Sequence, residues 1–598
     1  MRGTKTTVLE LDQLQAALRL RGLFGRWIAR AAYRILELEE VNRIHSKFSE
    51  HFGPDFSAHV LEEIAVSYDI PEAQLDRIPK EGGFITVSNH HYGAVDGMIL
   101  SSVIGSRRPD YKILTTFVLS MIPNLKDSFI GVDNFSSGGD KSISGIRCAL
   151  GHLSSGNPLG LFPAGEVATW QKGRVVEDIP WAENIIKMVR KTGFPVIPIY
   201  FEGGNSRSFH ILGRIHPRLR TIRLIHEMLH MRGRVVKARI GQPISASEVE
   251  NLDVPTLGRY LRSRCYALEA QCLLPEVKVA KKPEAQLAAH VPEEKIRAEI
   301  DANEDKMLFE TAGYRAYLFY ASDAPCTMQE LYRLREETFR AVGEGTGKSM
   351  DTDPYDAYYR QMILWHVQNR EIVGAYRLGP GAEAIASHGG VQGLYSASLY
   401  HYGEKAVPLL EQSLELGRSF IVQKYQREIY PLRLLFTGLA VSSLKFPQLA
   451  FFSGPVSISD AIPRFYQSLI VRFLEKNFRL PDSDKTASPS VPFEPDFLSV
   501  NPDDLLGPVQ GDISAFDKLL ETISDGKYHL PVLVRIYFSS GSRFANFNVD
   551  PDFSNSLDAL IFLRYSDFPQ KMLRMFLRSL PESLQDAVWF HFYGTHIS

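Results

Sequence analysis

The sequence predicts an α/β fold divided into two domains, and three observations support this prediction. The chain has 598 residues, which is too many for one hydrophobic core. Short apolar runs alternate with helical patterns over residues 83–243, as is typical of an α/β domain. A charged, alanine-rich stretch then precedes a second half with its own strands and helices. We therefore predict an N-terminal amphipathic helical region at 1–50, a first domain at 51–275, a charged helical linker at 276–306 and a second domain at 307–598.

The composition excludes several classes of protein. Hydrophobic residues make up 44% and charged residues 23% of the chain, which is ordinary for a globular protein. A net charge of −2 gives no overall attraction for nucleic acid, so we expect no nucleic-acid partner. The four cysteines are sparse and lack metal-type spacing, which fits a reducing, cytoplasmic location.

The N-terminal region carries a possible membrane-surface helix. Residues 1–12 are polar, so we expect no secretory signal, and no run reaches the roughly 18 apolar residues of a spanning helix. Residues 14–44 repeat apolar side chains at helical spacing, with Trp27 and Phe24 among them and several arginines between. Such a basic amphipathic helix binds membrane surfaces, but it can also pack on its own domain. Both interpretations stay open.

The strands of the first domain are predicted from short apolar runs. They fall at 84–88, 112–114, 159–162, 196–200 and 235–240. In the second domain we predict a helix at 328–339, strands at 371–378, 432–441 and 530–538, and a loop at 479–507 that is rich in Pro, Ser and Asp.

A histidine and a carboxylate follow the first of these strands. The segment reads Asn89-His90-His91-Tyr92-Gly93-Ala94-Val95-Asp96. Acyl transfer to an alcohol needs a general base, because a hydroxyl is a poor nucleophile near neutral pH. A histidine can take the proton, and a nearby carboxylate can orient the ring and stabilise the imidazolium. The segment therefore predicts an acyl-transfer site.

These residues resemble the glycerolipid acyltransferase family, whose first block is Asn-His, a four-residue spacer and Asp. His91 has the family's spacing to Asp96, whereas His90 has the family's Asn-His position, so either could be the base. Two later blocks also match, Phe162-Pro163-Ala164-Gly165-Glu166 and Val196-Ile197-Pro198-Ile199. The resemblance implies that Gly165, Glu166 and Pro198 belong to the site. Ala164 stands where the family has its acid and no arginine occurs at 129–134, which suggests an acceptor other than lysophosphatidate, or an inactive site.

Two further patterns suggest other chemistry. His226-Glu227-Met228-Leu229-His230 fits the His-Glu-x-x-His zinc-protease pattern, but no third ligand stands out downstream, so we expect no metal. Residues 343–349 resemble a phosphate-binding loop, but Val342 replaces the first glycine and a helix is predicted before it. We therefore expect no nucleotide there.

A second set of residues lies in the C-terminal half. In order, it comprises Arg335, Phe339, Asp351-Thr-Asp353-Pro-Tyr-Asp356, Gly374-Ala-Tyr-Arg377-Leu and Glu415-Leu-Gly-Arg418-Ser419. This order and spacing are similar to the acyl-homoserine-lactone synthases and the ornithine N-acyltransferases, which share the GNAT-type fold. With the N-terminal blocks, the chain from about 31 to 568 resembles the bifunctional ornithine-lipid synthases. The resemblance implies an N-terminal glycerolipid-acyltransferase-like α/β domain and a C-terminal GNAT-like α/β domain.

The chemistry of the second site follows from its substrates. An amine attacks a phosphopantetheine thioester directly once a carboxylate has taken its proton, and Glu415 is our first candidate for that base. Arg377 and Arg418 would orient carboxylates, with Arg335, Asp353, Asp356 and Ser419 completing the substrate site. Alternatively, Glu415 and Arg418 form a structural pair on one helical face at (i, i+3).

The resemblance implies two consecutive acyl transfers. The C-terminal domain would N-acylate ornithine from a 3-hydroxyacyl carrier-protein thioester, and the N-terminal domain would then O-acylate the lyso-ornithine lipid. The expected partners are acyl carrier protein, ornithine, lyso-ornithine lipid and the inner face of the inner membrane, where the protein would be peripheral. No cofactor is expected beyond acyl-ACP or acyl-CoA as co-substrate. The alternatives are another amino acid or a lysophospholipid as acceptor, or a non-catalytic membrane-associated scaffold.

Overall fold

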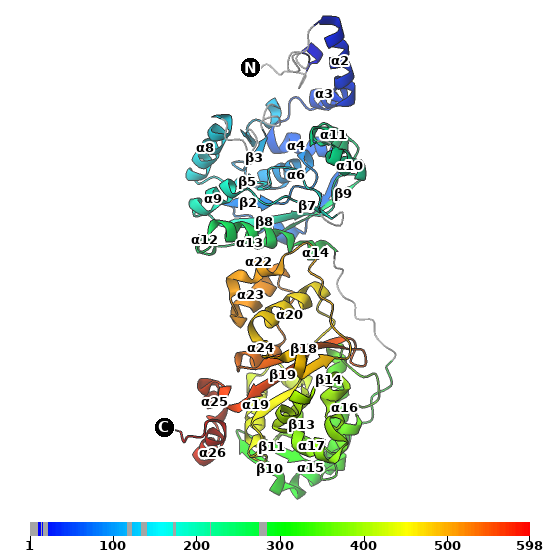
Figure 1. Ribbon diagram of the computed structural model, residues 1–598, viewed down its shortest axis with the longest axis vertical. Coiled ribbons are helices and arrows are strands. Elements are labelled where there is room, and N and C mark those ends of the chain that lie inside the picture. Colours follow the sequence, from blue (N-terminus) through cyan, green and yellow to red (C-terminus); the bar gives the residue numbers. More distant parts are fainter. Residues whose placement is uncertain are drawn as a thin grey trace. The chain divides into compact units, whose positions relative to one another are not determined.

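The chain forms two compact units. The computed structural model describes residues 10–12, 15, 22–116, 122–132, 140–171, 175–215, 217–273 and 284–597. The first unit contains Met1–Pro275 together with Phe497–Pro508 and Lys518–Lys527, and the remainder forms the second unit (Figure 1). The sequence did not predict that two segments of the C-terminal half would join the first unit.

The first unit is built on a seven-stranded sheet in the order β1-β9-β8-β2-β5-β3-β4. All its neighbouring strands are parallel except β8 and β9. The strands are β1 (Ser67–Asp69), β2 (Ile85–Ser88), β3 (Lys112–Thr116), β4 (Phe129–Val132), β5 (Leu159–Leu161), β8 (Val196–Phe201) and β9 (Val235–Ile240), and a separate hairpin joins β6 (Thr169–Trp170) to β7 (Val176–Glu177). The α/β prediction is confirmed here, as are the strands expected at 84–88, 112–114, 159–162, 196–200 and 235–240.

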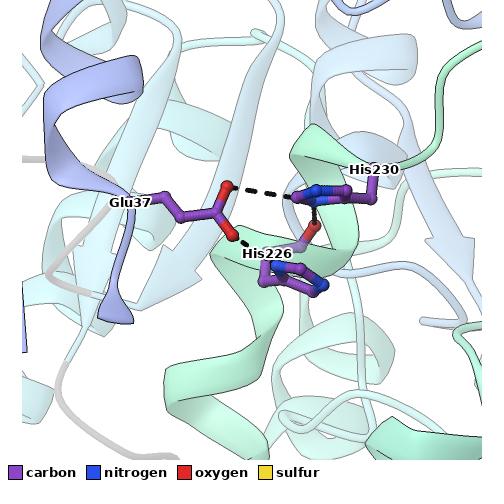
Figure 2. A group of neighbouring side chains, drawn as sticks. All are labelled: Glu37, His226 and His230. Atoms are coloured by element: carbon purple, nitrogen blue, oxygen red, sulfur yellow. Dashed lines mark hydrogen bonds and ion pairs between the residues drawn. The ribbon is translucent and has the colours of Figure 1, made fainter. Parts of the chain in front are cut away.

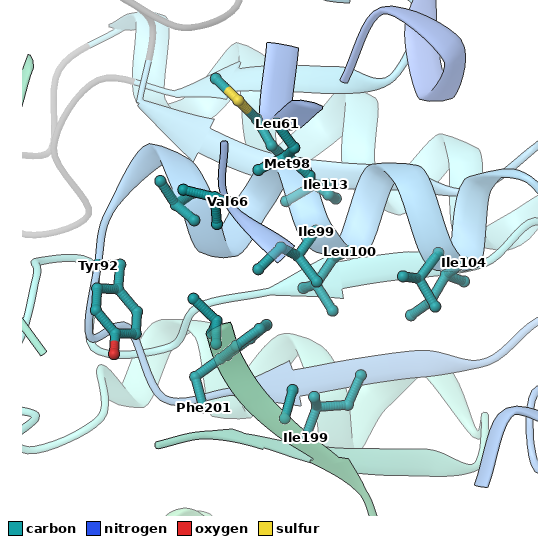
Figure 3. Close-up of a cluster of buried hydrophobic side chains, with 14 of the residues drawn as sticks. Leu61, Val66, Tyr92, Met98, Ile99, Leu100, Ile104, Ile113, Ile199 and Phe201 are labelled. Atoms are coloured by element: carbon teal, nitrogen blue, oxygen red, sulfur yellow. The ribbon is translucent and has the colours of Figure 1, made fainter. Parts of the chain in front are cut away.

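Helices connect these strands. They are α4 (Gly53–Glu63), α5 (Glu72–Leu75), α6 (Ala94–Gly105), η1 (Pro123–Leu125), α8 (Asp140–Ser154), α9 (Glu183–Thr192), α10 (Arg207–Ile215), α11 (Pro217–Leu229), α12 (Ala246–Glu250), α13 (Val254–Tyr266) and α14 (Glu269–Leu273). Helix α6 is buried over nearly its whole length, because it packs between α4 and the sheet. Figure 3 shows part of this core, in which Ile99 and Ile104 of α6 lie among side chains of α4, β3 and β8. The core therefore holds the residues between β2 and α6 in place.

The N-terminal helix is broken. In place of one helix at 14–44 the structure has α2 (Gly22–Ile35) and α3 (Leu38–Lys47), and residues 13, 14 and 16–21 lie outside the described part. Glu37, between the two helices, has the left-handed φ of 50°, which ends α2. Among the described residues, no helix has the length and apolar composition to cross a membrane.

The second unit is built on an eight-stranded sheet in the order β10-β11-β12-β13-β15-β16-β19-β18. Its neighbours are antiparallel except β15 and β16. The strands are β10 (Met307–Thr311), β11 (Tyr314–Phe319), β12 (Arg360–His366), β13 (Glu371–Pro380), β15 (Ser413–Ile421), β16 (Phe451–Ile458), β18 (Arg543–Asp550) and β19 (Ser556–Arg564), and β14 (Tyr400–Tyr402) pairs with β17 (Ala487–Pro489) beside it.

The only parallel pair of this sheet separates partway along its length. β15 and β16 are in register at Ser413–Phe451, Leu414–Phe452 and Glu415–Ser453, and then diverge. Gly454 marks this point with a φ of 138°, and a Cβ there would lie 2.2 Å from the backbone oxygen of Leu416. Beyond it, the facing edges of the two strands border an open pocket.

Most helices of this half surround the second sheet, whereas those parts within 497–508 and 518–527 belong to the first unit. The longer ones are α15 (Glu293–Ala302), α16 (Pro325–Ala341), α17 (Gly381–Ser387), α19 (Ile429–Ser443), α20 (Arg464–Phe478), α23 (Ile513–Ile523), α24 (Val532–Ser539), α25 (Gln570–Leu577) and α26 (Glu582–Tyr593). Short helical turns are η3 (Glu304–Lys306), η4 (Pro354–Ala357), η5 (Gly390–Gly393), η6 (Tyr395–Ser398), η7 (Glu404–Ala406), α18 (Val407–Glu411), η8 (Gln423–Tyr425), α21 (Ser483–Thr486), α22 (Pro502–Leu506), η9 (Gly507–Val509) and η10 (Tyr565–Asp567).

Three predictions for this half differ from the structure. The strands expected at 432–441 and 530–538 are helices α19 and α24, whereas the helix at 328–339 and the strand at 371–378 are confirmed. Of the expected linker, residues 276–283 lie outside the described part. Helix α15, which follows, buries Ile296 and Ile300 in the core, so it belongs to the second unit and is not a solvated linker.

Candidate active sites

The first candidate site lies where β2 ends and α6 begins. Nδ1 of His90 lies 3.1 Å from Oδ2 of Asp96, and the carboxylate is completely buried. The His90 side chain is 19% exposed, and its ring lies against Phe162 at 4.3 Å between centroids. A carboxylate on Nδ1 leaves Nε2 as the nitrogen that can accept a proton, so the pair has the geometry of an oriented general base.

Backbone contacts fix both members of this pair. The Asp96 carboxylate also accepts hydrogen bonds from the backbone N–H groups of Tyr92 (2.9 Å) and Gly93 (3.1 Å) at the start of α6. The backbone N–H of His90 donates to the buried Asp178 at 3.1 Å. Asn89 exchanges hydrogen bonds of 2.9 and 2.8 Å with the backbone of Phe201 in β8, so its amide continues the sheet and is structural.

The structure separates the two adjacent histidines. Since neighbouring side chains at the end of a strand point in opposite directions, His91 lies inside the unit near the rings of Tyr200 and Tyr266. Only 2% of His91 is exposed, and burial lowers its pKa to about 4. The structure therefore brings His90, and not His91, onto Asp96.

The Phe-Pro-Ala-Gly-Glu block borders the same site. The backbone N–H of Ala168 donates to the carbonyl of His90 at 2.7 Å, which ties the segment after the block to the histidine. Gly165 has a φ of 71°, and the half-exposed Glu166 forms an ion pair of 2.6 Å with Arg220 of α11. The sequence did not indicate this arginine, because the family's arginine was expected at 129–134 and Arg220 lies far along the chain from there. Pro198, in contrast, is buried within β8 opposite Val87, so its position is structural.

The His-Glu-x-x-His segment lies on α11, as predicted. In Figure 2 the Glu37 carboxylate faces both imidazoles, with an ion pair to His226 and Nδ1 of His230 at 3.8 Å. These three side chains could hold a cation, and Glu37 would then supply the third ligand that the downstream sequence lacked. Glu227, which a metalloprotease would use as its base, is 8% exposed and is instead bound to Ser206 and Arg223. The segment therefore does not have the arrangement of a protease site.

The loop that resembles a phosphate-binding loop is occupied by a side chain. The Glu336 carboxylate accepts hydrogen bonds from the backbone N–H groups of Thr346 (3.1 Å) and Gly347 (2.9 Å). Because a phosphate would need these N–H groups, the geometry of the loop does not suit a nucleotide.

The second candidate site contains a closed network of charges. Three arginines pair with three aspartates: the buried Arg335 with Asp351 (2.9 Å) and Asp356 (2.8 Å), the buried Arg377 with Asp353 (2.5 Å) and Asp356 (3.2 Å), and the partly buried Arg418 with Asp351 and Asp353 (both 3.3 Å). Burial opposes ionisation of Asp356, but Arg335 and Arg377 hold its pKa at about 2. These residues are therefore mostly engaged with one another, although Nε and Nη2 of Arg377 have no hydrogen-bond partner among the described residues, and of the arginines only Arg418 also lines the pocket.

Glu415 lies on strand β15, so the helical pairing with Arg418 that we considered is wrong. Its buried carboxylate accepts hydrogen bonds from the backbone N–H groups of Tyr395 and Ser396, both at 3.0 Å, and from the hydroxyls of Tyr359 and Ser396. Glu415 does not line the pocket. This environment favours a structural role, in which the carboxylate holds the 395–396 turn against the sheet, and its role as a base stays a prediction.

The pocket lies between the diverging strands. Leu416, Gly417, Arg418 and Ser419 of β15 form one wall, and residues 453–457 of β16 form the other. Arg418 has a left-handed φ of 48° at the point where the pairing of β15 with β13 is irregular. This backbone conformation turns its side chain out of the regular strand pattern. Aromatic rings and two aspartates complete the lining: Phe339, Tyr376, Tyr395, Tyr537, Phe553, Asp550 and Asp558.

Sequence reasoning missed the acidic side of this pocket. Asp550 and Asp558 are each only 5% exposed. Such burial is common for the apolar side chains of a strand but rare for carboxylates that form no ion pair. Asp558 could have been noticed as a lone acid in the apolar strand Ser556–Arg564. Asp550 ends strand β18 and was not among the predicted site residues.

Comparisons with known proteins match both halves of the chain. The acyltransferase family model matches residues 8–270, and the acetyltransferase (GNAT) domain model matches residues 334–435. A glycine N(alpha)-acyltransferase of Phocaeicola vulgatus is 33% identical over 35% of this chain and 67% of its own length. The enzyme of that name from Bacteroides thetaiotaomicron is 28% identical over 49% of this chain and 91% of its own. A lyso-glycine lipid O-acyltransferase of Phocaeicola vulgatus is 24% identical over 38% and 83%.

The folds, the sites and these matches define an acyltransferase enzyme with N- and O-acylation activities. An acyltransferase domain forms its N-terminal half and a GNAT-type domain its C-terminal half. The chain belongs to the family of aminolipid acyltransferases that these relatives represent.

Proposed function

We propose that this protein makes ornithine lipid in two steps, each at one of its two sites. The C-terminal unit N-acylates ornithine from a 3-hydroxyacyl carrier-protein thioester. The N-terminal unit then O-acylates the 3-hydroxyl of the lyso-lipid from a second acyl carrier protein. The observation that carries this proposal is the presence in one chain of an oriented histidine base and of a GNAT-type pocket between diverging strands.

The N-acylation step follows from the shape of the pocket. Strand edges that diverge beyond Glu415 and Ser453 leave backbone groups that an extended chain can pair with. The amide-containing arm of phosphopantetheine has that character, so in this proposal its thioester lies between β15 and β16. The amine nitrogen forms the new C–N bond, the thiolate leaves, and the proton of the amine passes to a carboxylate or water.

The O-acylation step follows from the His90–Asp96 pair. Nε2 of His90 takes the proton of the hydroxyl as the oxygen attacks the thioester carbonyl. Asp96 stabilises the imidazolium, which then protonates the departing thiolate. Glu166 pairs with Arg220 two residues before Ala168, which is bonded to His90, and Arg220 offers a cation for the headgroup of the lyso-lipid.

A second candidate acceptor for the first step is glycine. The observation that favours it is the name of two relatives, which are glycine N(alpha)-acyltransferases. The two acceptors differ in charge, because ornithine carries an additional ammonium on its side chain.

Mass spectrometry of lipids tests the proposal. We expect a bacterium that lacks aminolipids to form ornithine lipid when it expresses the full chain, and only lyso-ornithine lipid when it expresses the His90→Ala variant. A glycine lipid in place of the ornithine lipid would identify the second candidate. Altered phosphatidic acid with no aminolipid would contradict both.

A further inference from the structure

Beside the Arg–Asp network of the second site lies a separate group of acids, here called the acid group: Glu344, Asp550 and Asp558. Asp550 and Asp558 line the pocket, and Glu344 contacts its wall through Ser457, whose hydroxyl lies 3.3 Å from the Glu344 carboxylate. Ser457 is also the β16 residue directly opposite Asp558. The acid group therefore forms one side of the pocket, at the outer end of the diverging strands.

The charges of the acid group are not balanced by cations. Within the part of the chain that the structure describes, none of the acid group forms an ion pair. Asp550 accepts hydrogen bonds only from the backbone N–H groups of Asp552 (2.9 Å) and Phe553 (3.2 Å). Among the described residues, none donates to the Asp558 carboxylate, although 95% of that residue is buried. Arg418 is nearby, but its own charge is matched by Asp351 and Asp353.

Burial raises the pKa values of all members of the acid group. The pKa of Glu344 rises to about 7, and that of Asp558 lies well above its ordinary value, first through burial and then through Asp550 and Glu344. Carboxyl groups that are expensive to ionise in an empty pocket become ionised when a cation enters. The acid group is therefore suited to a cationic ligand.

The rest of the pocket fits an alkylammonium group. Phe339 and Phe553 pack edge to face at 5.3 Å between centroids, and both line the pocket with Tyr395. Methylene groups pack well on such rings, and an ammonium is attracted to their faces. Arg418 lies on the opposite wall, where it can meet a carboxylate.

We propose that Asp558, with Asp550 and Glu344, binds the side-chain ammonium of the amino-acid acceptor and so selects a diamino acid over glycine. The proposal rests on the N-acylation assigned to this unit above. The α-carboxylate is then held on the Arg418 side, and the α-amine points to the thioester between the strands. Glycine, which lacks the second ammonium, leaves the acid group without a partner.

The test compares ornithine with norvaline, which has the same carbon chain without the terminal amine. Purified full-length enzyme with 3-hydroxyacyl carrier protein is assayed for kcat/KM on both. We expect Asp558→Asn and Glu344→Gln each to lower the ratio of ornithine to norvaline turnover, by roughly 30-fold or more for Asp558→Asn, because a buried charge pair is lost. The matched control is Asp552→Asn, which removes an exposed carboxylate from the same turn and should leave the ratio unchanged.

The outcomes separate this proposal from the proposed function. An equal loss on both substrates in Asp558→Asn, with the fold intact by circular dichroism, would overturn the ammonium site and assign Asp558 to proton transfer. An unchanged ratio would also overturn it. If the wild-type enzyme acylates no amino acid, the proposed function fails, and calorimetry still decides the ammonium site: ornithine must bind the wild-type protein more tightly than norvaline does.

Discussion

Residue by residue, the O-acyl site depends on one of two adjacent histidines. We expect His90→Ala to lower O-acylation roughly 10²- to 10⁴-fold, the usual contribution of a general base, and to leave N-acylation intact. His91→Asn is the matched control: the hydrogen bond to Asp96 comes from His90 and His91 is buried, so this variant should keep most of the activity. The measurement is the rate of ester formation on synthetic lyso-lipid. Equal loss in both variants would show that the local fold, and not a base at His90, was removed.

The acid group predicts a pH dependence of ornithine binding. All three carboxyl groups have raised pKa values, and Glu344, whose pKa is about 7, is largely protonated near pH 6 in the empty pocket. Binding of an ammonium requires them to ionise, so affinity for ornithine should rise from pH 6 to pH 8. Norvaline should show no such rise. The other ionisable groups that face the pocket keep their charge over this range; they are Tyr376, Tyr395, Arg418 and Tyr537.

Thermal-shift measurements check this prediction. The increase in Tm caused by saturating ornithine should be larger at pH 8 than at pH 6, and the binding should release protons, seen as a binding enthalpy that changes with the buffer. A shift in Tm that is larger at pH 6 would contradict the sign of the argument.

Among the secondary-structure elements, the separation of β15 from β16 depends on a glycine. A methyl group at Gly454 would meet the backbone oxygen of Leu416, and the φ of 138° disfavours any other residue. We expect Gly454→Ala to reduce the free energy of unfolding by about 1–3 kcal/mol and to lower N-acylation. Gly417→Ala on the facing strand is the control for stability, because no atom lies within 4 Å of the added methyl. Denaturant titration of both variants measures the difference.

The elements also show how far the sequence could be interpreted. The parallel strands of the first unit were predictable, because short apolar runs alternate there with helices. Helix α19 was mistaken for a strand because it is buried almost all round, and such a helix has no amphipathic period. The choice between His90 and His91 required the structure, because the family's Asn-His position indicates His90 whereas its spacing to the aspartate indicates His91. The acid group needed it too, since Glu344, Asp550 and Asp558 come from separate elements.

For the whole molecule, we propose that α2 places the enzyme on the inner face of the inner membrane, where its lyso-lipid intermediate would reside. Trp27 is 67% and Ile35 66% exposed on this helix, and Arg26, Arg30 and Arg34 are its basic side chains. The net charge of −2 gives the chain no general attraction to anionic lipid, so any attraction must be local to α2. Each basic side chain contributes about 1 kcal/mol near an anionic surface, which is lost in high salt.

Vesicle sedimentation distinguishes this surface role from packing within the protein. The full chain should bind vesicles that contain anionic lipid and should release them at high salt. The Trp27→Ser and Arg30→Gln variants should bind these vesicles more weakly, because the first lacks the apolar anchor and the second lacks one charge. Lys187→Gln is a control that removes an exposed cation far along the chain from α2. If the Trp27 and Arg30 variants instead lower Tm and leave vesicle binding unchanged, α2 is a structural helix. In that case only the covalent fusion of the two domains would keep the lyso-lipid near the O-acylation site. The fusion raises the local concentration of the lyso-lipid without any membrane contact.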